Sequence, residues 1–241
     1  MTPTDAEIAR DLAPTGVLRA SIDLGNPVLA QGTPDEPSGV TVELAREVAA
    51  RLELPVQFSC FDAARKSYAA MSEGHADLCF LAVDPDREKD VAFSTPYVHI
   101  EGVYAAPVDA AFTSAADVDR DGVRIGVKKG SAYDLYLSRT LHHATVVRGD
   151  EGVDIFHAED LDVAAGIRQP LTVHVSQTAE LRLLEPAFMT IRQAVGTTRG
   201  RSPKTTRFLN ELVTELVASG FVSKALRHSG QDPTLAAPTA V

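Results

Sequence analysis

Apolar residues follow two alternating patterns along this chain. Short apolar runs typical of buried strands alternate with longer segments in which apolar residues return every three or four positions, as on one face of a helix. Residues 42–52 show the helical spacing most clearly. Because strands that alternate with helices usually form parallel sheets, the pattern predicts an α/β fold.

Two series of strands and helices are expected. In the first, strands are expected at residues 16–22, 56–61 and 76–83, and helices at residues 42–52 and 63–72, the second with Asp62 as its N-cap. In the second, strands are expected at residues 123–127, 145–148 and 161–165, and helices at residues 132–141, 151–159 and 169–178, the first with Ser131 as its N-cap.

Extended segments connect the two series. They are expected at residues 98–106, 181–184 and 189–195, with crossings between the lobes near Tyr104 and Ala194. Two helices, 203–219 and 221–227, then return to the first lobe. The predicted architecture is two α/β lobes with a hinge, residues 1–105 plus 195–241 and residues 106–194. The tail from Gln231, rich in Pro, Ala and Thr, is expected to be disordered.

Composition narrows the classes of function. The chain has 241 residues, 44% of them hydrophobic, and a formal net charge of -10. Nucleic acid is not an expected partner, because phosphate binding requires a basic surface. No apolar stretch is long enough to span a bilayer, so membrane insertion is not expected. Cys60 and Cys79 lie in apolar runs and are expected to be reduced and buried.

The N-terminal residues show no basic region, apolar core or small-residue cleavage site, as a secretory signal would. They look instead like a capped amphipathic helix. The sequence as it stands therefore predicts a cytoplasmic location, with a periplasmic one only if a leader has been removed.

Arg87 is the first candidate for ligand binding. It follows the apolar run 78–83 and is the second residue of the segment Asp-Arg-Glu-Lys-Asp-Val-Ala-Phe-Ser-Thr-Pro-Tyr at residues 86–97. A guanidinium group offers a rigid fork of donors that matches a carboxylate. The alternative interpretation is that Arg87 caps carbonyl groups or pairs with Asp84 or Asp86 at the surface.

Four segments give the chain a resemblance to the type II periplasmic-binding proteins, the amino-acid and solute receptors of ABC transporters. They are residues 39–48, 76–97, 125–131 and 220–221, and the second is the most specific. The resemblance covers residues 15–229. It implies a two-lobed fold with an interlobe ligand cleft, no cofactor, and a small-molecule ligand. An ABC permease would be a partner only if the protein were exported.

The resemblance also implies roles for individual residues. Arg87 would bind a carboxylate, and the turn formed by Gly130, Ser131 and Ala132 would add hydroxyl and backbone N–H donors at a helix N-terminus. Three positions depart from the family pattern. Ala82 replaces a hydroxyl residue, Asn26 lies in a segment where an aromatic residue is usual, and Ile167 followed by Arg168 replaces the aspartate that holds an ammonium group.

These departures predict a carboxylate site without a clear amine anchor. Arg168 would meet a second anionic group of the ligand, or pair with Asp162 or Glu159. The ligand is therefore expected to be a small amino-acid-like or organic acid.

A rival hypothesis is a cytoplasmic dehydratase or lyase on the same scaffold, acting on a cyclic carboxylate. Its candidate acids and bases are Glu101, Lys128, Lys129 and Asp134. Glu101 lies in an apolar extended stretch and is either a buried structural acceptor or a general base. A third hypothesis is an intracellular sensor module, for which no motif argues. The sequence leaves the ligand and the oligomeric state open.

Overall fold

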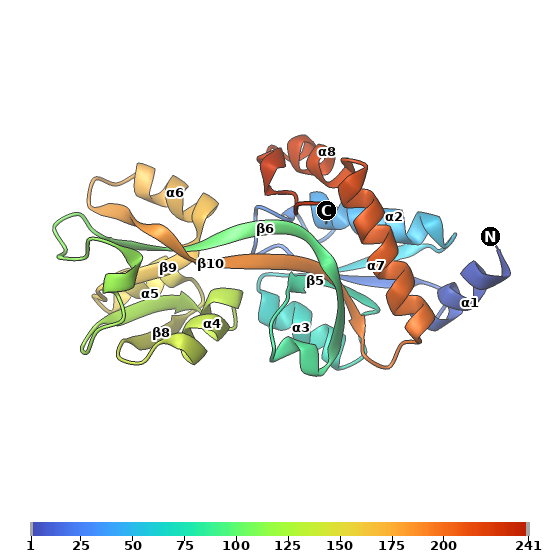
Figure 1. Cartoon of the computed structure of the whole chain (residues 1–241), viewed down its shortest axis with the longest axis horizontal. Coiled ribbons are helices and arrows are strands. Elements are labelled where there is room, and N and C mark those ends of the chain that lie inside the picture. Colours follow the sequence, from blue (N-terminus) through green and yellow to red (C-terminus); the bar gives the residue numbers. More distant parts are fainter. Residues whose placement is uncertain (1, 240–241) are drawn as a thin grey trace. The chain divides into compact units, whose positions relative to one another are not determined.

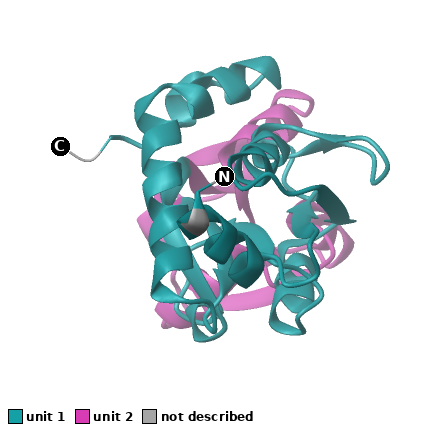
Figure 2. Ribbon diagram, turned by 90° about the vertical axis from the view of Figure 1, so that its right-hand side faces the viewer, with its two compact units in different colours: residues 1–99, 192–241 teal, residues 100–191 magenta. Residues whose placement is uncertain are grey.

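The computed structural model describes residues 2–239 and divides the chain into two compact units. Unit 1 comprises residues 1–99 and 192–241, and unit 2 comprises residues 100–191 (Figure 2). The boundaries lie a few residues before the predicted crossings near Tyr104 and Ala194. The chain passes between the units twice, along the long strands β6 (Val91–Pro107) and β10 (Leu181–Thr198).

Unit 1 contains most of the helices (Figure 1). Besides parts of β6 and β10, its elements are α1 (Pro3–Leu12), β1 (Leu18–Asp23), β2 (Gln31–Gly32), β3 (Pro37–Ser38), α2 (Val40–Arg51), β4 (Val56–Phe61), α3 (Ala64–Ser72), β5 (Leu78–Ala82), the 3-10 helix η1 (Arg87–Lys89), α7 (Pro203–Ala218), α8 (Phe221–His228) and the 3-10 helix η3 (Pro233–Leu235).

The sheet of unit 1 has the strand order β4-β1-β5-β10. Strand β1 pairs in parallel with β4 and β5, as the alternating pattern predicts, and β10 pairs with β5 antiparallel. Helices α2 and α3 pack against β1, and α7 packs against both α1 and α8 (Figure 1). Strand β5 is buried along its whole length, which places the segment after it at the end of a rigid element.

Unit 2 repeats this plan on a smaller scale. Besides parts of β6 and β10, its elements are the 3-10 helix η2 (Ala115–Asp117), β7 (Arg124–Lys128), α4 (Ala132–Thr140), β8 (Thr145–Gly149), α5 (Gly152–Ala158), β9 (Val163–Ile167) and α6 (Arg168–Ser176). Its strand order is β6-β9-β7-β8, in which β7 is parallel to both neighbours and β9 is antiparallel to β6.

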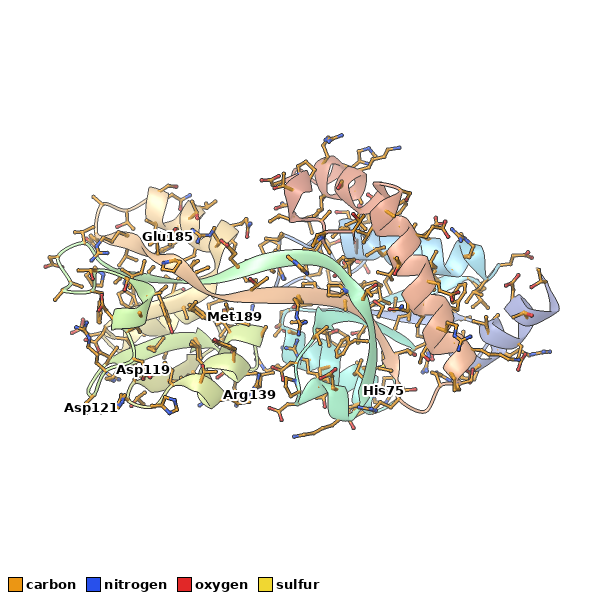
Figure 3. The ribbon with its side chains drawn as sticks, viewed as in Figure 1. His75, Asp119, Asp121, Arg139, Glu185 and Met189 are labelled. Atoms are coloured by element: carbon orange, nitrogen blue, oxygen red, sulfur yellow. The ribbon has the colours of Figure 1, made fainter. Side chains whose placement is uncertain are left out.

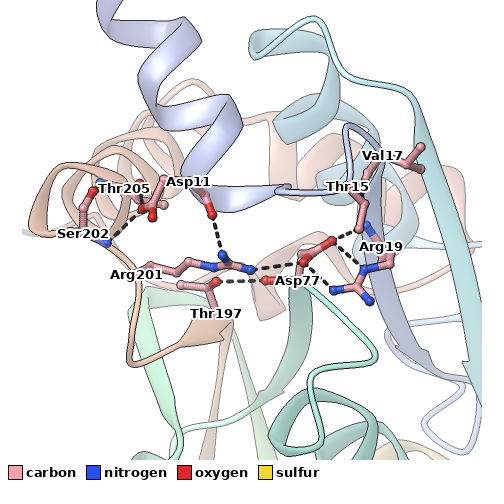
Figure 4. Close-up of polar contacts among 9 residues, drawn as sticks. All are labelled: Asp11, Thr15, Val17, Arg19, Asp77, Thr197, Arg201, Ser202 and Thr205. Atoms are coloured by element: carbon pink, nitrogen blue, oxygen red, sulfur yellow. Dashed lines mark hydrogen bonds and ion pairs between the residues drawn. The ribbon is translucent and has the colours of Figure 1, made fainter.

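A buried carboxylate ties several segments of unit 1 together (Figure 4). Asp77 is fully buried and accepts from Arg19 Nη2 at 2.8 Å and from Arg201 Nη2 at 3.1 Å. Thr197 donates to the main-chain oxygen of Asp77 at 2.9 Å. Asp11, in α1, accepts from the Ser202 N–H at 2.8 Å. The N-terminal helix is thereby joined to the start of α7.

The N-terminal helix itself has the expected cap. The Thr2 hydroxyl accepts from the Asp5 N–H at 3.1 Å, and the Asp5 carboxylate accepts from the Thr2 N–H at 2.9 Å. This reciprocal pair is a capping box.

Three local predictions were wrong. Ala63, not Asp62, is the N-cap of α3, and Asp62 pairs with Lys66 instead. Cys60 is only half-buried, whereas Cys79 is buried; both thiols are free. The tail beyond Gln231 is ordered as far as it is described, because Ala236 bridges to Val98 in β6.

Across residues 2–239, no helix combines the length and the apolar character needed to cross a membrane.

Candidate ligand-binding site

Arg87 is a buried cation at the end of strand β5. It begins η1, its exposed fraction is 3%, and its Nη1 donates to the Ala82 carbonyl oxygen at 3.2 Å. Burial lowers the pKa of the guanidinium, and the negative charges of Asp84 and Asp23 act in the opposite direction. The alternative interpretation was that Arg87 caps carbonyl groups or pairs with an aspartate at the surface. Arg87 does cap a carbonyl group, but it is buried and does not lie at the surface.

A second buried polar side chain adjoins the same strand end. Gln193, in β10, is the register partner of Ala82 and is 6% exposed. Its Oε1 atom is buried and has no hydrogen-bond partner among residues 2–239. The hydroxyl of Tyr97, a fully buried residue of β6, likewise lacks a partner there. Buried polar atoms in native structures are nearly always paired, so both atoms require an explanation.

Asn26 shapes the turn that follows β1. It is 6% exposed, and its side-chain oxygen accepts from the Val28 N–H at 3.3 Å. Its main-chain oxygen accepts from the N–H groups of Leu29 and Ala30. The side chain fixes the backbone locally, and its contact with a ligand stays a prediction.

In unit 2, the turn after β7 has the predicted glycine and N-cap. Gly130 has a φ of 71°, in the left-handed region that glycine adopts without strain. Ser131 caps α4, and its hydroxyl oxygen accepts from the Asp134 N–H at 3.1 Å. Ala132 is the first residue of the helix. The turn therefore has the backbone form that the resemblance implies.

Asp134 occupies part of this turn. Its carboxylate accepts from the Gly130 N–H at 2.8 Å, from the Ser138 hydroxyl at 3.1 Å and from Arg148 Nε at 3.0 Å. The Asp134 side chain is 4% exposed. One backbone donor that the resemblance assigns to a ligand is thus already satisfied by a carboxylate of the protein itself.

Lys128 ends β7 and forms an ion pair with Glu151, the N-cap residue of α5, at 2.5 Å. The Lys128 side chain is 11% exposed and that of Glu151 is 54% exposed. The positive charge of Lys128 is therefore balanced within unit 2.

Glu101, Arg168 and Glu185 form a single ion cluster in unit 2. Arg168 Nε binds the Glu101 carboxylate, and its Nη1 and Nη2 bind the two Glu185 oxygens at 2.6 and 2.8 Å. Figure 3 labels Glu185, which lies on β10. The two glutamates raise the pKa of Arg168, chiefly by hydrogen bonding to Glu185.

The predicted partners of Arg168 were therefore wrong. Glu159 instead binds Arg124 Nη2 at 2.8 Å, and Asp162 accepts from the Arg124 N–H at 2.8 Å.

A pocket of about 220 Å³ lies within unit 2 where β9 ends. Its wall includes Ile167, which the resemblance places where the family has an aspartate, together with Tyr133, Glu151 and His174. The Nε2 atom of His174 is buried without a partner among the described residues. Over the same residues, no group of three or more His, Cys, Asp or Glu side chains is arranged to hold a metal ion.

Within each unit, the structure brings predicted site residues together. Arg87 and Ala82 meet in unit 1, and Gly130, Ser131, Ala132 and Asp134 share one turn in unit 2. Sequence reasoning missed Gln193, Glu151 and Glu185. None of the three stands out in the sequence; Gln193, for example, follows Arg192 in the segment 189–195, which is expected only to be extended.

A family model matches most of the chain. The model of the bacterial extracellular solute-binding proteins, family 3, matches residues 19–229. Among curated protein sequences, none matches.

Several solved structures share the fold. A mutant of ArgBP from T. maritima has a TM-score of 0.74 and 19% identity, over 92% of this chain and 99% of the other. The cysteine-binding protein from Campylobacter jejuni has a TM-score of 0.73 and 20% identity, over 93% and 92%. An ancestral amino acid-binding protein, a precursor of cyclohexadienyl dehydratase, has a TM-score of 0.71 and 18% identity, over 90% and 97%.

Proposed function

Since this chain belongs to the bacterial extracellular solute-binding proteins of family 3, we propose that it binds a small carboxylate-containing molecule through Arg87. The type II periplasmic-binding-protein fold and a solute-binding role follow from the family and the structural neighbours. The carboxylate, and the residues that hold it, are the proposed part.

The burial of Arg87 is the observation that carries the proposal. A guanidinium that is 3% exposed has lost most of its hydration. Its burial lowers its pKa, which means that the protein disfavours the charged form. A ligand carboxylate would supply bidentate, charge-assisted hydrogen bonds and offset this cost. The binding energy would then come largely from the interaction of the ligand carboxylate with the Arg87 guanidinium, which is already buried and is positioned by its hydrogen bond to the Ala82 carbonyl.

Gln193 supports the same location. Its unpaired Oε1 belongs to the residue that faces Ala82 across the sheet, and Ala82 also holds the Arg87 side chain. A bound molecule that donates a hydrogen bond would satisfy this amide oxygen. We therefore assign Gln193 a second polar contact with the ligand, beside the carboxylate contact of Arg87.

The proposal does not require an ammonium group on the ligand. Ile167 is apolar where the family has an aspartate, and Arg168, which follows it, is bound by two glutamates. Several structural neighbours are named for amino-acid binding, and one is a complex with lysine. Amino acids therefore belong to the proposed class of small carboxylate-containing ligands, and they differ from its other members in carrying an amine.

Matched ligands test this function. Isothermal titration calorimetry would compare an amino acid, the same molecule without its amino group, and the amine without its carboxylate. We expect both carboxylates to bind and the amine that lacks a carboxylate not to bind. An amine that binds as tightly as its parent amino acid would contradict the proposal. Native mass spectrometry of the purified protein would show whether a carboxylate co-purifies and which molecule should begin the series.

The alternative, a dehydratase or lyase acting on a cyclic carboxylate, has less support. The fold resembles that of a dehydratase precursor, but Glu101 and Lys128 are each held in an ion pair, and Asp134 accepts three hydrogen bonds. A free acid or base is what elimination of water would require. The test is to incubate the protein with cyclic hydroxy-carboxylates and to look for loss of water by mass spectrometry. Detection of the dehydrated product would establish the enzyme.

The predicted cytoplasmic location stays a proposal, and the interlobe position of the ligand stays a prediction. Fractionation of the source cells, followed by immunodetection, tests the first of these directly.

A further inference from the structure

A second cavity lies within unit 1, and none of the proposed ligand residues lines it. Its wall is built from β6 near Thr95 and His99, from β10 at Arg192, from the last turn of α7, and from residues 237–239 of the tail. We refer to it as the tail pocket. Neither Arg87, Ala82, Gln193 nor Asn26 lines it. Its contents would therefore be separate from the ligand proposed above.

The tail wall of this pocket is fixed by main-chain contacts. Ala236 pairs with Val98 in an antiparallel bridge, and the Ala237 N–H donates to the Tyr97 carbonyl oxygen at 2.9 Å. The Ser223 hydroxyl, in α8, donates to the Pro233 carbonyl oxygen at 3.2 Å. The tail is thus held at both η3 and β6, which gives the pocket a defined outer wall.

The pocket has the size and the surface of a small-molecule site. Its volume is about 340 Å³, within the range of roughly 300–1,000 Å³ typical of ligand cavities. Its apolar lining residues include Val217, Ala218, Ala237 and Pro238. Such a wall favours an apolar molecule, because removing apolar surface from water is favourable.

The charge of the pocket is positive. Arg192 lines it, and within the described chain its guanidinium has no hydrogen-bond or ion-pair partner, unlike Arg19, Arg168 and Arg201. No lining residue is acidic. His99 lies close enough to Arg192 to be affected by its charge, and burial followed by that charge lowers the pKa of the imidazole. His99 therefore adds a neutral hydrogen-bonding group, and Arg192 is the one cation of the wall.

We propose that the tail pocket is a second binding site, for a small monocarboxylate with a compact apolar body. Arg192 would bind the carboxylate, and the wall formed by α7 and the tail would cover the apolar part. His99 and Arg192 are also the residues at which β6 leaves unit 1 and β10 returns to it. An occupant would therefore contact both segments that connect the two units.

Benzoate is a suitable probe, with benzamide as its neutral counterpart of nearly the same shape. Titrations followed by ¹H–¹⁵N NMR would use the whole chain, so that shifts near Thr95, Val217 and Ala237 are separated from shifts near Arg87. The variants are Arg192→Gln, which removes the charge, and Ala218→Leu, which fills the cavity. Arg207→Gln is the matched control, because Arg207 is another exposed arginine of unit 1 and does not line the pocket.

We expect saturable benzoate binding at the tail pocket, about tenfold weaker in Arg192→Gln and in Ala218→Leu, and unchanged in Arg207→Gln. Benzamide should bind at least tenfold more weakly than benzoate to the unaltered protein. Shifts confined to the Arg87 segment, shifts that do not saturate, or equal benzoate affinity in Arg192→Gln would overturn the proposal. Because the readout is resolved by residue, failure here leaves the proposal for Arg87 standing, and failure at Arg87 leaves this one standing.

Discussion

Arg87 in unit 1 and Arg168 in unit 2 occupy equivalent places in their sequences and opposite electrostatic environments. Each arginine begins a helical turn soon after a largely buried strand, β5 or β9. Burial lowers the pKa of Arg87, whereas two glutamates raise the pKa of Arg168. Two glutamates bind Arg168 directly, whereas at Arg87 the desolvation outweighs the effect of Asp84 and Asp23, and an added anion would reduce that cost. The same local pattern thus gives a structural arginine in one unit and a candidate ligand contact in the other.

Carboxylates that pair with arginine provide a way to sharpen this comparison. If pairing makes an arginine structural, removing its carboxylate should reduce stability, by an amount that grows with the burial of the carboxylate. Asp77, Asp134 and Glu185 form such a series, with side chains 0%, 4% and 61% exposed.

Asp77→Ala should have the largest effect. The substitution leaves Arg19 and Arg201 without their shared carboxylate and removes the acceptor that binds the Arg19 N–H (Figure 4). We expect a loss of about 3–5 kcal/mol in the free energy of unfolding, as for a broken buried ion pair. Chemical denaturation followed by circular dichroism measures it. A loss under about 1 kcal/mol would show that burial of the carboxylate does not determine how much stability its removal costs.

Asp134→Ala should have an intermediate effect. It removes the acceptor of the Gly130 N–H and a partner of Arg148, whose side chain is 43% exposed. We expect a loss of about 2 kcal/mol, in the range for hydrogen bonds to a charged group. The same denaturation experiment measures it, with Asp121→Ala as the control because the Asp121 side chain is 93% exposed. If both variants lost equal stability, the role assigned to the turn would be wrong.

Glu185→Gln should have the smallest effect, and one that depends on pH. Hydrogen bonding to Arg168 lowers the pKa of Glu185 below its usual value of 4.5. A lowered carboxylate pKa adds stability above the usual value, and this contribution is lost as the pH falls through the folded-state pKa. Because Glu185 is exposed, we expect under about 1 kcal/mol at neutral pH.

Thermal unfolding between pH 7 and pH 3 measures this dependence. The unaltered protein should lose its advantage over Glu185→Gln below about pH 4.5, where the carboxylate begins to be protonated. An advantage that grows as the pH falls would contradict the assigned ion pair.

The sequence predicted what depends on local pattern. The α/β class, the strand at residues 56–61 and the Ser131 cap follow from periodicity and capping preference, and the structure contains all three. Each of these features is fixed by residues a few positions apart.

Features that depend on distant contacts were missed. Arg168 was expected to pair with nearby Asp162 or Glu159, but its partners come from β6 and β10, 67 and 17 residues away. The tail from Gln231 has the composition of a disordered segment, yet Ala236 finds an open position beside Val98 on β6. The sequence alone does not reveal these partners, because the fold brings together residues that are far apart along the chain.

Calorimetric titration of the Arg87→Ala and Arg168→Ala variants with the carboxylate that binds the unaltered protein tests the central claim most directly. Arg87→Ala should lose roughly 2–4 kcal/mol of binding free energy, about 30- to 1,000-fold in affinity, whereas Arg168→Ala should change affinity less than about threefold. Thermal unfolding of both variants checks that they fold. If Arg87→Ala does not fold, Arg87→Lys replaces it in the titration, because lysine retains the charge without the fork of donors. Unchanged affinity in a folded Arg87 variant, or an equal loss in Arg168→Ala, would contradict the account.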